Sequence, residues 1–501
     1  MGLMNGGASK AYSARRPGAT VTGALLAVLM AASCGSAAPT RRASGHGSTG
    51  VGASGTSDPA GSTGIAAGAS TPSTVGQGGG AGTGTGPGNS TQVTTGRPAG
   101  APPTTLATAR RQPKVDTSAL IGTRLAFVSG SALWEVNAGA LNEVAAPTGF
   151  LPSHPTFSAD GRWLAFLETP SGSSTAMPQL WLATSAGRSA RVVSAAPDPE
   201  ALQWSPSGEK LLVTTAGATG PAEVLVVDPS GSATQLGSGL VASAAWSPDG
   251  TRAGVSLTNH GATGFTSVIE SVPAAGGLPT VWQTNTQDVL EVAEWWSAWG
   301  IVYWDDPDGS ASIAADGLEL DALSGPAQTP HPLADTLVRS DWLTAGPDAA
   351  AALVQGGDRL EWDGKSVAVC KPFGCQSVPT PSGSVTVDPA LSAQGQLAYV
   401  QGSASQSFDS SPAQVSAWEA GHSLWVEAAG SKSPSPLAGG SGANAPAWSS
   451  DGQRLMFVKA GVLWVLPATG GTPVEVATDL SVPPSYYGQV QWLEQFAWTS
   501  G

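Results

Sequence analysis

The sequence predicts an all-β protein assembled from repeated antiparallel sheets, and three observations lead to this prediction. The 501-residue chain contains 66 glycines and 39 prolines, a composition that disfavours long helices. A phrase made of an aromatic residue, a serine and a short Pro/Asp/Gly turn recurs at intervals of 42 to 61 residues. No helical stretch separates the copies, and all 18 tryptophans lie beyond residue 116. Three or four short strands per period of roughly 45 residues are typical of a β-propeller.

The first 33 residues have the layout of a secretory signal peptide. Lys10, Arg15 and Arg16 precede an apolar run over residues 21–32, which ends in small side chains. About a dozen apolar residues are too few to cross a roughly 30 Å hydrocarbon core comfortably. We therefore expect residues 1–33 to direct export, with an uncleaved membrane anchor as an alternative.

Cys34 follows the small residues directly. The run Ala31-Ala32-Ser33-Cys34 resembles the lipobox of bacterial lipoproteins, although Ala31 stands where that family usually has leucine. The resemblance implies that Cys34 becomes a diacylated N-terminus, and two acyl chains are what stable anchoring generally needs. We expect an extracytoplasmic protein anchored to the bacterial cell membrane by this lipid, or a secreted one if lipidation fails.

Residues 34–115 predict a flexible tether. The segment is almost entirely Gly, Ser, Thr, Ala and Pro, which cannot bury enough apolar surface to offset the entropy of ordering. A coil of about 80 residues reaches roughly 50 Å, far enough to clear a lipid headgroup layer. The net charge is +5 for residues 35–115 and −22 for residues 116–501, within a total of −14 for the whole chain. Such an acidic body argues against binding nucleic acid.

Residues 116–501 contain the repeats. We call the aromatic residue that opens each phrase the anchor. It ends a short strand, a turn with glycine follows, and an apolar strand comes next, as in Leu211-Leu212-Val213. The clear anchors are Phe157, Trp204, Trp246 and Trp448, and looser copies are placed at Trp295, Trp342, Val387 and Trp492.

These phrases resemble the W-S-P-D-G repeats of the TolB-type, or WD40-like, β-propeller family. The resemblance covers nearly all of residues 121–498 and implies a closed ring of antiparallel blades. The number of blades varies in that family, so it is counted from this sequence. TolB acts through protein partners at the cell envelope, which favours a binding role but transfers no partner.

Eight blades are predicted from the two ends of the repeat region. Residues 124–127 and 133–136 read as strands without a preceding anchor, and residues 489–492 read as an anchor strand without a blade after it. Joining them completes one blade and removes exposed sheet edges. Seven anchored units and this shared one give eight, with seven or six as alternatives.

Cys370 and Cys375 are the two cysteines of the body. In an exported chain, a pair this close predicts a disulfide across a tight loop. No second cysteine pair or nearby histidine completes four ligands, which disfavours zinc.

Few residues predict chemistry. Asp305, Asp306 and Asp308 are weak calcium candidates in a segment that reads better as a solvated turn. The recurring Ser, Asp and Gly of the turns have a structural role. The body has no G-x-S-x-G, H-E-x-x-H or P-loop motif, so no catalytic residue and no cofactor are predicted. The tryptophans at 295, 296, 299 and 304 serve core packing or ligand stacking.

Together these features predict a monomeric, non-enzymatic propeller that binds an envelope protein or a cell-wall glycan. The alternative is a propeller enzyme of the lactonase or quinone-dependent dehydrogenase type, with a channel site and possibly Ca²⁺. A sensor domain is a third possibility. No ligand-binding residue can be assigned from the sequence, and neither can the functional face.

Overall fold

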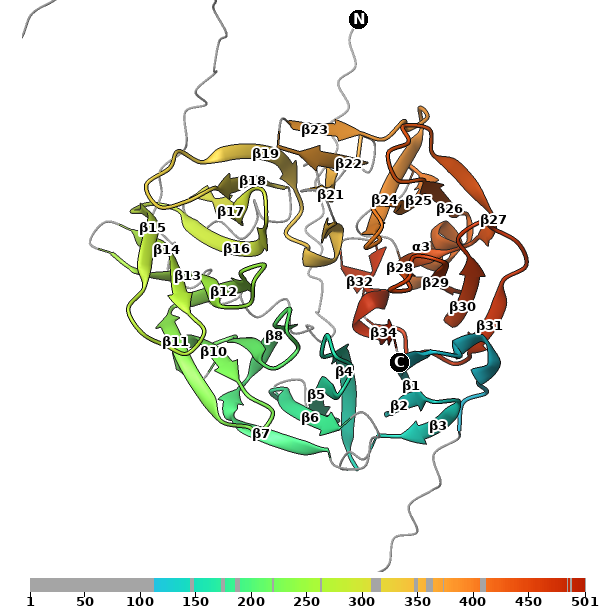
Figure 1. Cartoon of the computed structure of the whole chain (residues 1–501), viewed down its shortest axis with the longest axis horizontal. Coiled ribbons are helices and arrows are strands. Elements are labelled where there is room, and N and C mark those ends of the chain that lie inside the picture. Colours follow the sequence, from blue (N-terminus) through green and yellow to red (C-terminus); the bar gives the residue numbers. More distant parts are fainter. Residues whose placement is uncertain are drawn as a thin grey trace, which may run out of the picture. The chain divides into compact units, whose positions relative to one another are not determined.

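The computed structural model describes residues 112–500, except for 145–147, 173–175, 185–189, 219, 262–263, 308–316, 347–349, 357–363, 373, 406–410, 484 and 487–488. The predicted signal peptide, Cys34 and nearly all of the predicted tether therefore lie outside the described residues. The described residues form eight four-stranded antiparallel sheets around a central axis, together with a two-stranded hairpin (Figure 1). The predicted eight-bladed propeller is thereby confirmed.

The blades are numbered from the N-terminal strands, and each is given from its inner strand outwards. Blade one contains β34 (Phe496–Ser500), β1 (Thr123–Ser129), β2 (Ala132–Asn137) and β3 (Ala140–Glu143). Blade two contains β4 (Phe150–Phe157), β5 (Trp163–Pro170), β6 (Gln179–Thr184) and β7 (Arg191–Pro197). Blade three contains β8 (Pro199–Trp204), β9 (Leu211–Thr215), β10 (Ala222–Val227) and β11 (Ala233–Gly239). Blade four contains β12 (Val241–Trp246), β13 (Arg252–His260), β14 (Phe265–Pro273) and β15 (Thr280–Asn285).

The other four blades follow the same order. Blade five contains β16 (Val289–Trp296), β17 (Gly300–Asp306), β18 (Leu318–Leu323) and β19 (His331–Thr336). Blade six contains β20 (Leu343–Ala345), β21 (Ala351–Gln355), β22 (Ser366–Lys371) and β23 (Gly374–Ser377). Blade seven contains β24 (Ser384–Leu391), β25 (Leu397–Ser403), β26 (Ser423–Glu427) and β27 (Ser435–Ser441). Blade eight contains β28 (Asn444–Trp448), β29 (Arg454–Lys459), β30 (Val462–Pro467) and β31 (Val474–Ala477).

The two ends of the repeat region share blade one, as the sequence predicts (Figure 1). The strand that closes it is β34, however, and not the predicted 489–492. Gln489–Val490 is one strand of the small hairpin, and Trp492 begins a 3₁₀ helix, Trp492–Glu494. Trp498 is the anchor here, because it pairs with Leu125 as Trp204 pairs with Leu211.

Two other anchors also differ from the predicted ones. In blade six the strand pairing ends at Ala345, opposite Ala351, whereas Trp342 lies in a 3₁₀ helix and is 1% exposed. In blade seven it ends at Leu391, opposite Leu397, four residues after Val387. The position is set by strand register and by the turn that follows, so small or aliphatic residues occupy it as well. Trp295, the predicted anchor of blade five, lies opposite Ile301, and the pairing continues by one residue to Trp296 opposite Gly300.

The serine after the anchor holds the turn together. The Ser247 hydroxyl donates to Asp249 Oδ1 (2.6 Å) and accepts from the backbone N–H of Arg252 (3.0 Å). The same pair of bonds recurs at Ser449, towards Asp451 (2.5 Å) and Arg454 (2.9 Å). The bond from the Ser247 hydroxyl, followed by the bond from the Thr251 backbone N–H, lowers the pKa of Asp249. The recurring serine and aspartate are therefore occupied within the turn.

The hydrophobic core is divided among the spaces between neighbouring blades. One cluster, for example, joins Leu212, Val224 and Val226 of blade three to Trp246 and Val255 of blade four. Anchor indoles add a polar bond across the same boundary. Trp204 Nε1 donates to Thr156 O (3.0 Å), Trp246 Nε1 to Gln203 O (2.9 Å) and Trp448 Nε1 to Ala390 O (3.0 Å). Each acceptor is the residue directly before the anchor of the preceding blade.

Two features lie outside the regular blade pattern. The helix α3 (Pro412–Ala420) is inserted between β25 and β26, and Ser411 and Gln414 form its capping box. The predicted disulfide between Cys370 and Cys375 is present, and it joins directly opposed residues of β22 and β23. Such a bond is typical of proteins that fold outside the cytoplasm.

The helices within the described part of the chain are all too short or too polar to qualify as membrane spans.

Candidate functional site

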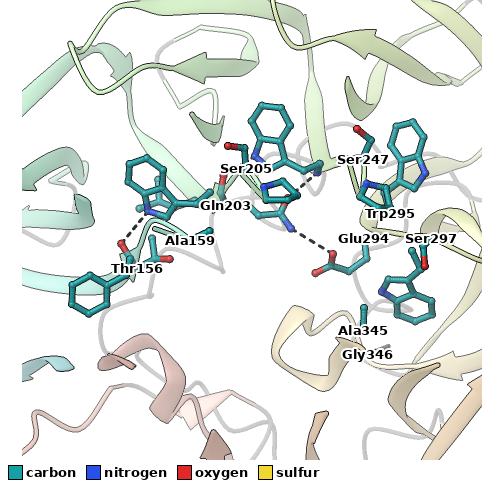
Figure 2. A pocket seen from close by; sticks show the side chains of 17 residues that line it. Thr156, Ala159, Gln203, Ser205, Ser247, Glu294, Trp295, Ser297, Ala345 and Gly346 are labelled. Atoms are coloured by element: carbon teal, nitrogen blue, oxygen red, sulfur yellow. Dashed lines mark hydrogen bonds between the residues drawn. The ribbon is translucent and has the colours of Figure 1, made fainter. Parts of the chain in front are cut away.

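A pocket opens at the end of the ring where the inner strands reach their anchors, which we call the anchor face. Its volume is about 590 Å³, and residues from the inner strands of blades two to six line it (Figure 2). This size is within the range of small-molecule sites. The lining residues used below are Thr156, Gln203, Trp204, Trp246, Glu294, Trp295, Trp296 and Ser297.

A polar pair crosses this pocket. Gln203 of β8 donates through Nε2 to Glu294 Oε2 of β16 at 3.4 Å, as Figure 2 shows. Because β12 stands between these two strands in the ring, the bond links blades three and five. Gln203 Oε1 accepts the backbone N–H of Trp246 on β12 (2.9 Å). This bond fixes the amide orientation, so that the NH₂ group faces the carboxylate.

The aromatic wall is held by the packing of the ring. The indole N–H groups of Trp204 and Trp246 are engaged between blades, which fixes their ring positions. Trp295 packs edge to face on Trp282, with ring centroids 5.1 Å apart. Trp296 is 3% exposed, and its indole N–H has no hydrogen-bond partner among the described residues. An unpaired buried donor beside a pocket can serve a ligand acceptor.

The electrostatics of the pocket and of the strands beneath it are acidic. Burial raises the pKa of Glu294 to about 7, and the bond from Gln203 opposes this shift. Burial and then the Asp306 charge raise the pKa of Glu291 to about 7. Burial, followed by the charges of Glu291 and Asp198, raises the pKa of Glu200 to about 8. No Lys, Arg or His is among the described residues that line the pocket.

A second, smaller pocket of about 350 Å³ lies between the closing strand and blade two. Phe157 of β4, Ala447 of β28 and Phe496 and Trp498 of β34 line it. Its walls carry no ionisable side chain from the described residues, so they offer a ligand an apolar surface but no charged group.

The predicted calcium candidates are only partly described. Asp305 and Asp306 end β17, and Asp308 lies outside the described residues. Burial raises the pKa of Asp305 to about 7, and the charges of Asp288, Asp321, Glu319 and Asp306 add to the shift. Over the described ranges, no group of three His, Cys, Asp or Glu side chains is placed to hold a metal ion.

Two residues of the tryptophan patch line the pocket. Trp295 and Trp296 line the pocket, whereas Trp299 and Trp304 are 6% and 5% exposed within the core. Trp304 Nε1 donates to Thr336 Oγ1 at 2.8 Å. Core packing is therefore found for Trp296, Trp299 and Trp304, and ligand stacking by Trp295 and Trp296 stays a prediction.

Gln203 and Glu294 belong to no motif that marks them as functional in the sequence. Both stand directly before an anchor, at the position whose carbonyl accepts the next anchor indole in three of the blades. In order from blade one, this position holds Ala497, Thr156, Gln203, Ala245, Glu294, Thr344, Ala390 and Ala447. Polar residues occur there only in blades two, three, five and six, which is the signal that marks this side of the ring.

No protein-family model matches this chain, and no curated protein matches it by sequence. Solved structures resemble its fold. A prolyl endopeptidase is 13% identical with a TM-score of 0.44, over 67% of this chain and 51% of that one. The β-propeller domain of the Trilobed protease from Pyrococcus furiosus is 10% identical (TM-score 0.40), over 67% of this chain and 100% of that one. TolB from Acinetobacter baumannii is 15% identical (TM-score 0.31), over 75% of this chain and 66% of that one. The chain thus spans about half the length of the prolyl endopeptidase, and these likenesses concern the fold alone.

Proposed function

We propose that this chain is a non-enzymatic binding protein of the bacterial cell envelope, which presents the anchor face of its propeller to an envelope protein or a cell-wall glycan. The observation that carries the proposal is the pocket of about 590 Å³, in which four tryptophans, Gln203 and Glu294 converge from several blades. Aromatic side chains in a concave, partly polar site are the usual basis of recognition.

The state of the repeated turns favours binding over catalysis. The Ser247 hydroxyl both donates and accepts a hydrogen bond within its own turn, and Ser449 does the same. A nucleophilic serine needs a base at its hydroxyl and a free path to substrate. The Ser–Asp pairs of these turns therefore have a structural role and are not catalytic pairs.

The position of the protein in the cell completes the proposal. Cys34 carries the lipid after removal of residues 1–33, and residues 34–115 tether the ring to the membrane. Metabolic labelling with a clickable fatty acid tests this: the wild-type chain is labelled in the membrane fraction, and Cys34→Ser is unlabelled and released. Labelling that persists in Cys34→Ser would contradict the assignment.

The binding role is tested by blocking the pocket. Ser297 is an exposed residue of the pocket rim, and Ser297→Trp fills the space without changing the charge. Ser238→Trp, on the outer strand β11, is the matched control. Crosslinking and affinity capture from membranes recover one partner with the wild type and the control, and Ser297→Trp loses it. Equal recovery by all three proteins, or no specific recovery by any, would refute the proposal.

An enzyme with a channel site is the second candidate. The raised pKa values of Glu200, Glu291 and Glu294 favour it, because carboxylates with a pKa near 7 are suited to general acid–base catalysis. Metal analysis and thermal melts with and without a chelator separate the two. A stoichiometric ion, with a large loss of stability on chelation, would favour the enzyme.

A further inference from the structure

The pocket on the anchor face contains a carboxylate without a positively charged neighbour. Glu294 accepts one long hydrogen bond, from Gln203 at 3.4 Å, and forms no ion pair with any Lys, Arg or His that the structure describes. Gln203 is itself held by the Trp246 N–H and approaches Glu294 only through its NH₂ group. A carboxylate in such a site is unfavourable unless a cation compensates it.

Two further carboxylates stand on the same two strands. Glu200 of β8 and Glu291 of β16 lie three residues before Gln203 and Glu294, roughly 10 Å further along the strands. Among the described residues, neither forms a hydrogen bond or an ion pair. After burial, the charge of Glu291 is the next cause of the raised pKa of Glu200. The acidic character therefore extends from the pocket along the inner strands.

The geometry favours an organic cation over a metal ion. Nowhere in the described part of the chain do three acidic, His or Cys side chains meet at metal-ligand spacing. Instead, the rings of Trp204, Trp246 and Trp295 line the same pocket as Glu294. Aromatic faces attract ammonium and guanidinium groups, and they also pack against the methylene stem of a lysine.

A second observation points to the rest of the ligand. Trp296 lines the pocket, is 3% exposed, and its indole N–H lacks a partner among the described residues. A buried donor of this kind is satisfied by a carbonyl oxygen. A peptide segment with a lysine supplies an ammonium group, an apolar stem and a backbone carbonyl together.

We propose that the pocket on the anchor face binds a lysine-bearing peptide segment of the partner, with the ammonium group paired to Glu294, the stem against the tryptophan rings and a backbone carbonyl at the Trp296 indole. This inference rests on the proposed binding function and names the chemistry of its ligand. Gln203 positions Glu294, and Glu200 and Glu291 supply the attractive field along the strands.

The test uses isothermal titration calorimetry with the propeller-bearing chain and the probe Ac-Gly-Lys-Gly-NH₂. The pH is 8, above the pKa of about 7 of Glu294, so that the carboxylate is largely ionised. The arms are the Nε-acetylated peptide, glucosamine and an N-acetylglucosamine oligomer. The variants are Glu294→Gln and, as the matched control, Glu209→Gln in an exposed turn. Thermal melts confirm that both variants fold.

The lysine peptide binds in the millimolar range, and acetylation or Glu294→Gln weakens it at least tenfold, the scale of a lost hydrogen bond to a charged group. Glu209→Gln leaves binding unchanged, and added salt weakens it. Equal binding of both peptides, or an unaffected Glu294→Gln, overturns the inference, and so does tighter binding of either sugar. If Ser297→Trp still abolishes capture of the envelope partner, the proposed function survives such a result. If capture is also unaffected, both fail.

Discussion

Replacing Glu200 by glutamine should stabilise the propeller at alkaline pH and have little effect at pH 5. Glu200 has a pKa of about 8 in the folded protein, raised from 4.5 first by burial and then by Glu291 and Asp198. At about 1.4 kcal/mol per unit, the shift corresponds to an upper bound of roughly 5 kcal/mol. The side chain keeps part of its surface open to water, which screens its charge, so we expect about 2 kcal/mol.

The sign follows from proton binding. The folded state binds more protons than the unfolded chain between the unfolded pKa of 4.5 and the folded pKa of about 8. Stability therefore rises as the pH falls through this window and is lowest above it. The glutamine variant is neutral at every pH, so its advantage appears only where Glu200 is ionised. The lowered pKa values of Asp249 and Asp451 act below 3.8 and do not contribute here.

Thermal unfolding followed by tryptophan fluorescence at pH 5 and pH 8.5 measures this difference. For a ring of roughly 390 residues, 2 kcal/mol corresponds to a rise in Tm of about 2 °C. Glu200→Gln should show it at pH 8.5 only, and Glu209→Gln, the exposed control, at neither pH. A Glu200→Gln protein that is less stable than wild type at pH 8.5 would refute the reasoning, because it would mean that the carboxylate has a compensating partner.

Three further predictions concern the scaffold. Trp246→Phe removes the indole bond to the Gln203 carbonyl between blades three and four, and denaturant unfolding should show that the free energy of unfolding falls by about 1 kcal/mol, mostly because the carbonyl is left unpaired. An unchanged free energy would mean that water replaces the donor. Replacing both Cys370 and Cys375 by serine opens a small loop within one hairpin, and the free energy of unfolding should fall by about 2 kcal/mol while the fold is retained. Unfolding of the whole ring would contradict this local role. Deleting residues 496–501 removes the buried Phe496 and exposes the edge of β1. The free energy of unfolding should fall by at least about 3 kcal/mol, and Tm and the yield of soluble protein should fall with it. A monomeric, equally stable product would argue against closure by this strand.

The fold was predictable because the turn chemistry repeats. Serine and glycine, often with aspartate, recur in the turn where the inner strand meets the next one. Ser247 and Ser449 show why, since each satisfies two groups of its turn. The anchors were harder to place. Ala345 and Leu391 occupy the anchor positions of blades six and seven although neither residue is aromatic. The sequence pattern therefore favours Trp342 and Val387 as the anchors. Residue type alone could not resolve a shift of three or four positions.

The closing blade shows the same limit. Trp492 and Trp498 both lie near the chain end, and the pairing of Trp498 with Leu125 identifies Trp498 as the anchor. Burial does not identify the anchor either, because Trp492 is 5% exposed whereas the anchor Trp498 is only partly buried. Deciding between them requires the register, which depends on the N-terminal strand more than 350 residues earlier.

At the candidate site, the residue type before the anchor differs from that of other blades, while the backbone geometry of the repeat is the same. In three blades the residue before the anchor presents its carbonyl to the anchor indole of the next blade, as Gln203 does for Trp246, and this contact uses only the backbone of that residue. Its side chain is therefore free to vary from blade to blade. Where it is alanine, as in Ala390 and Ala447, the blade only closes the ring, and where it is Gln203 or Glu294, a polar group reaches the anchor face. One side of the ring thus carries distinctive side chains on a repeated backbone, and ligand specificity should change with these few positions. At Gln203 stability should change as well, because its Oε1 accepts the backbone N–H of Trp246.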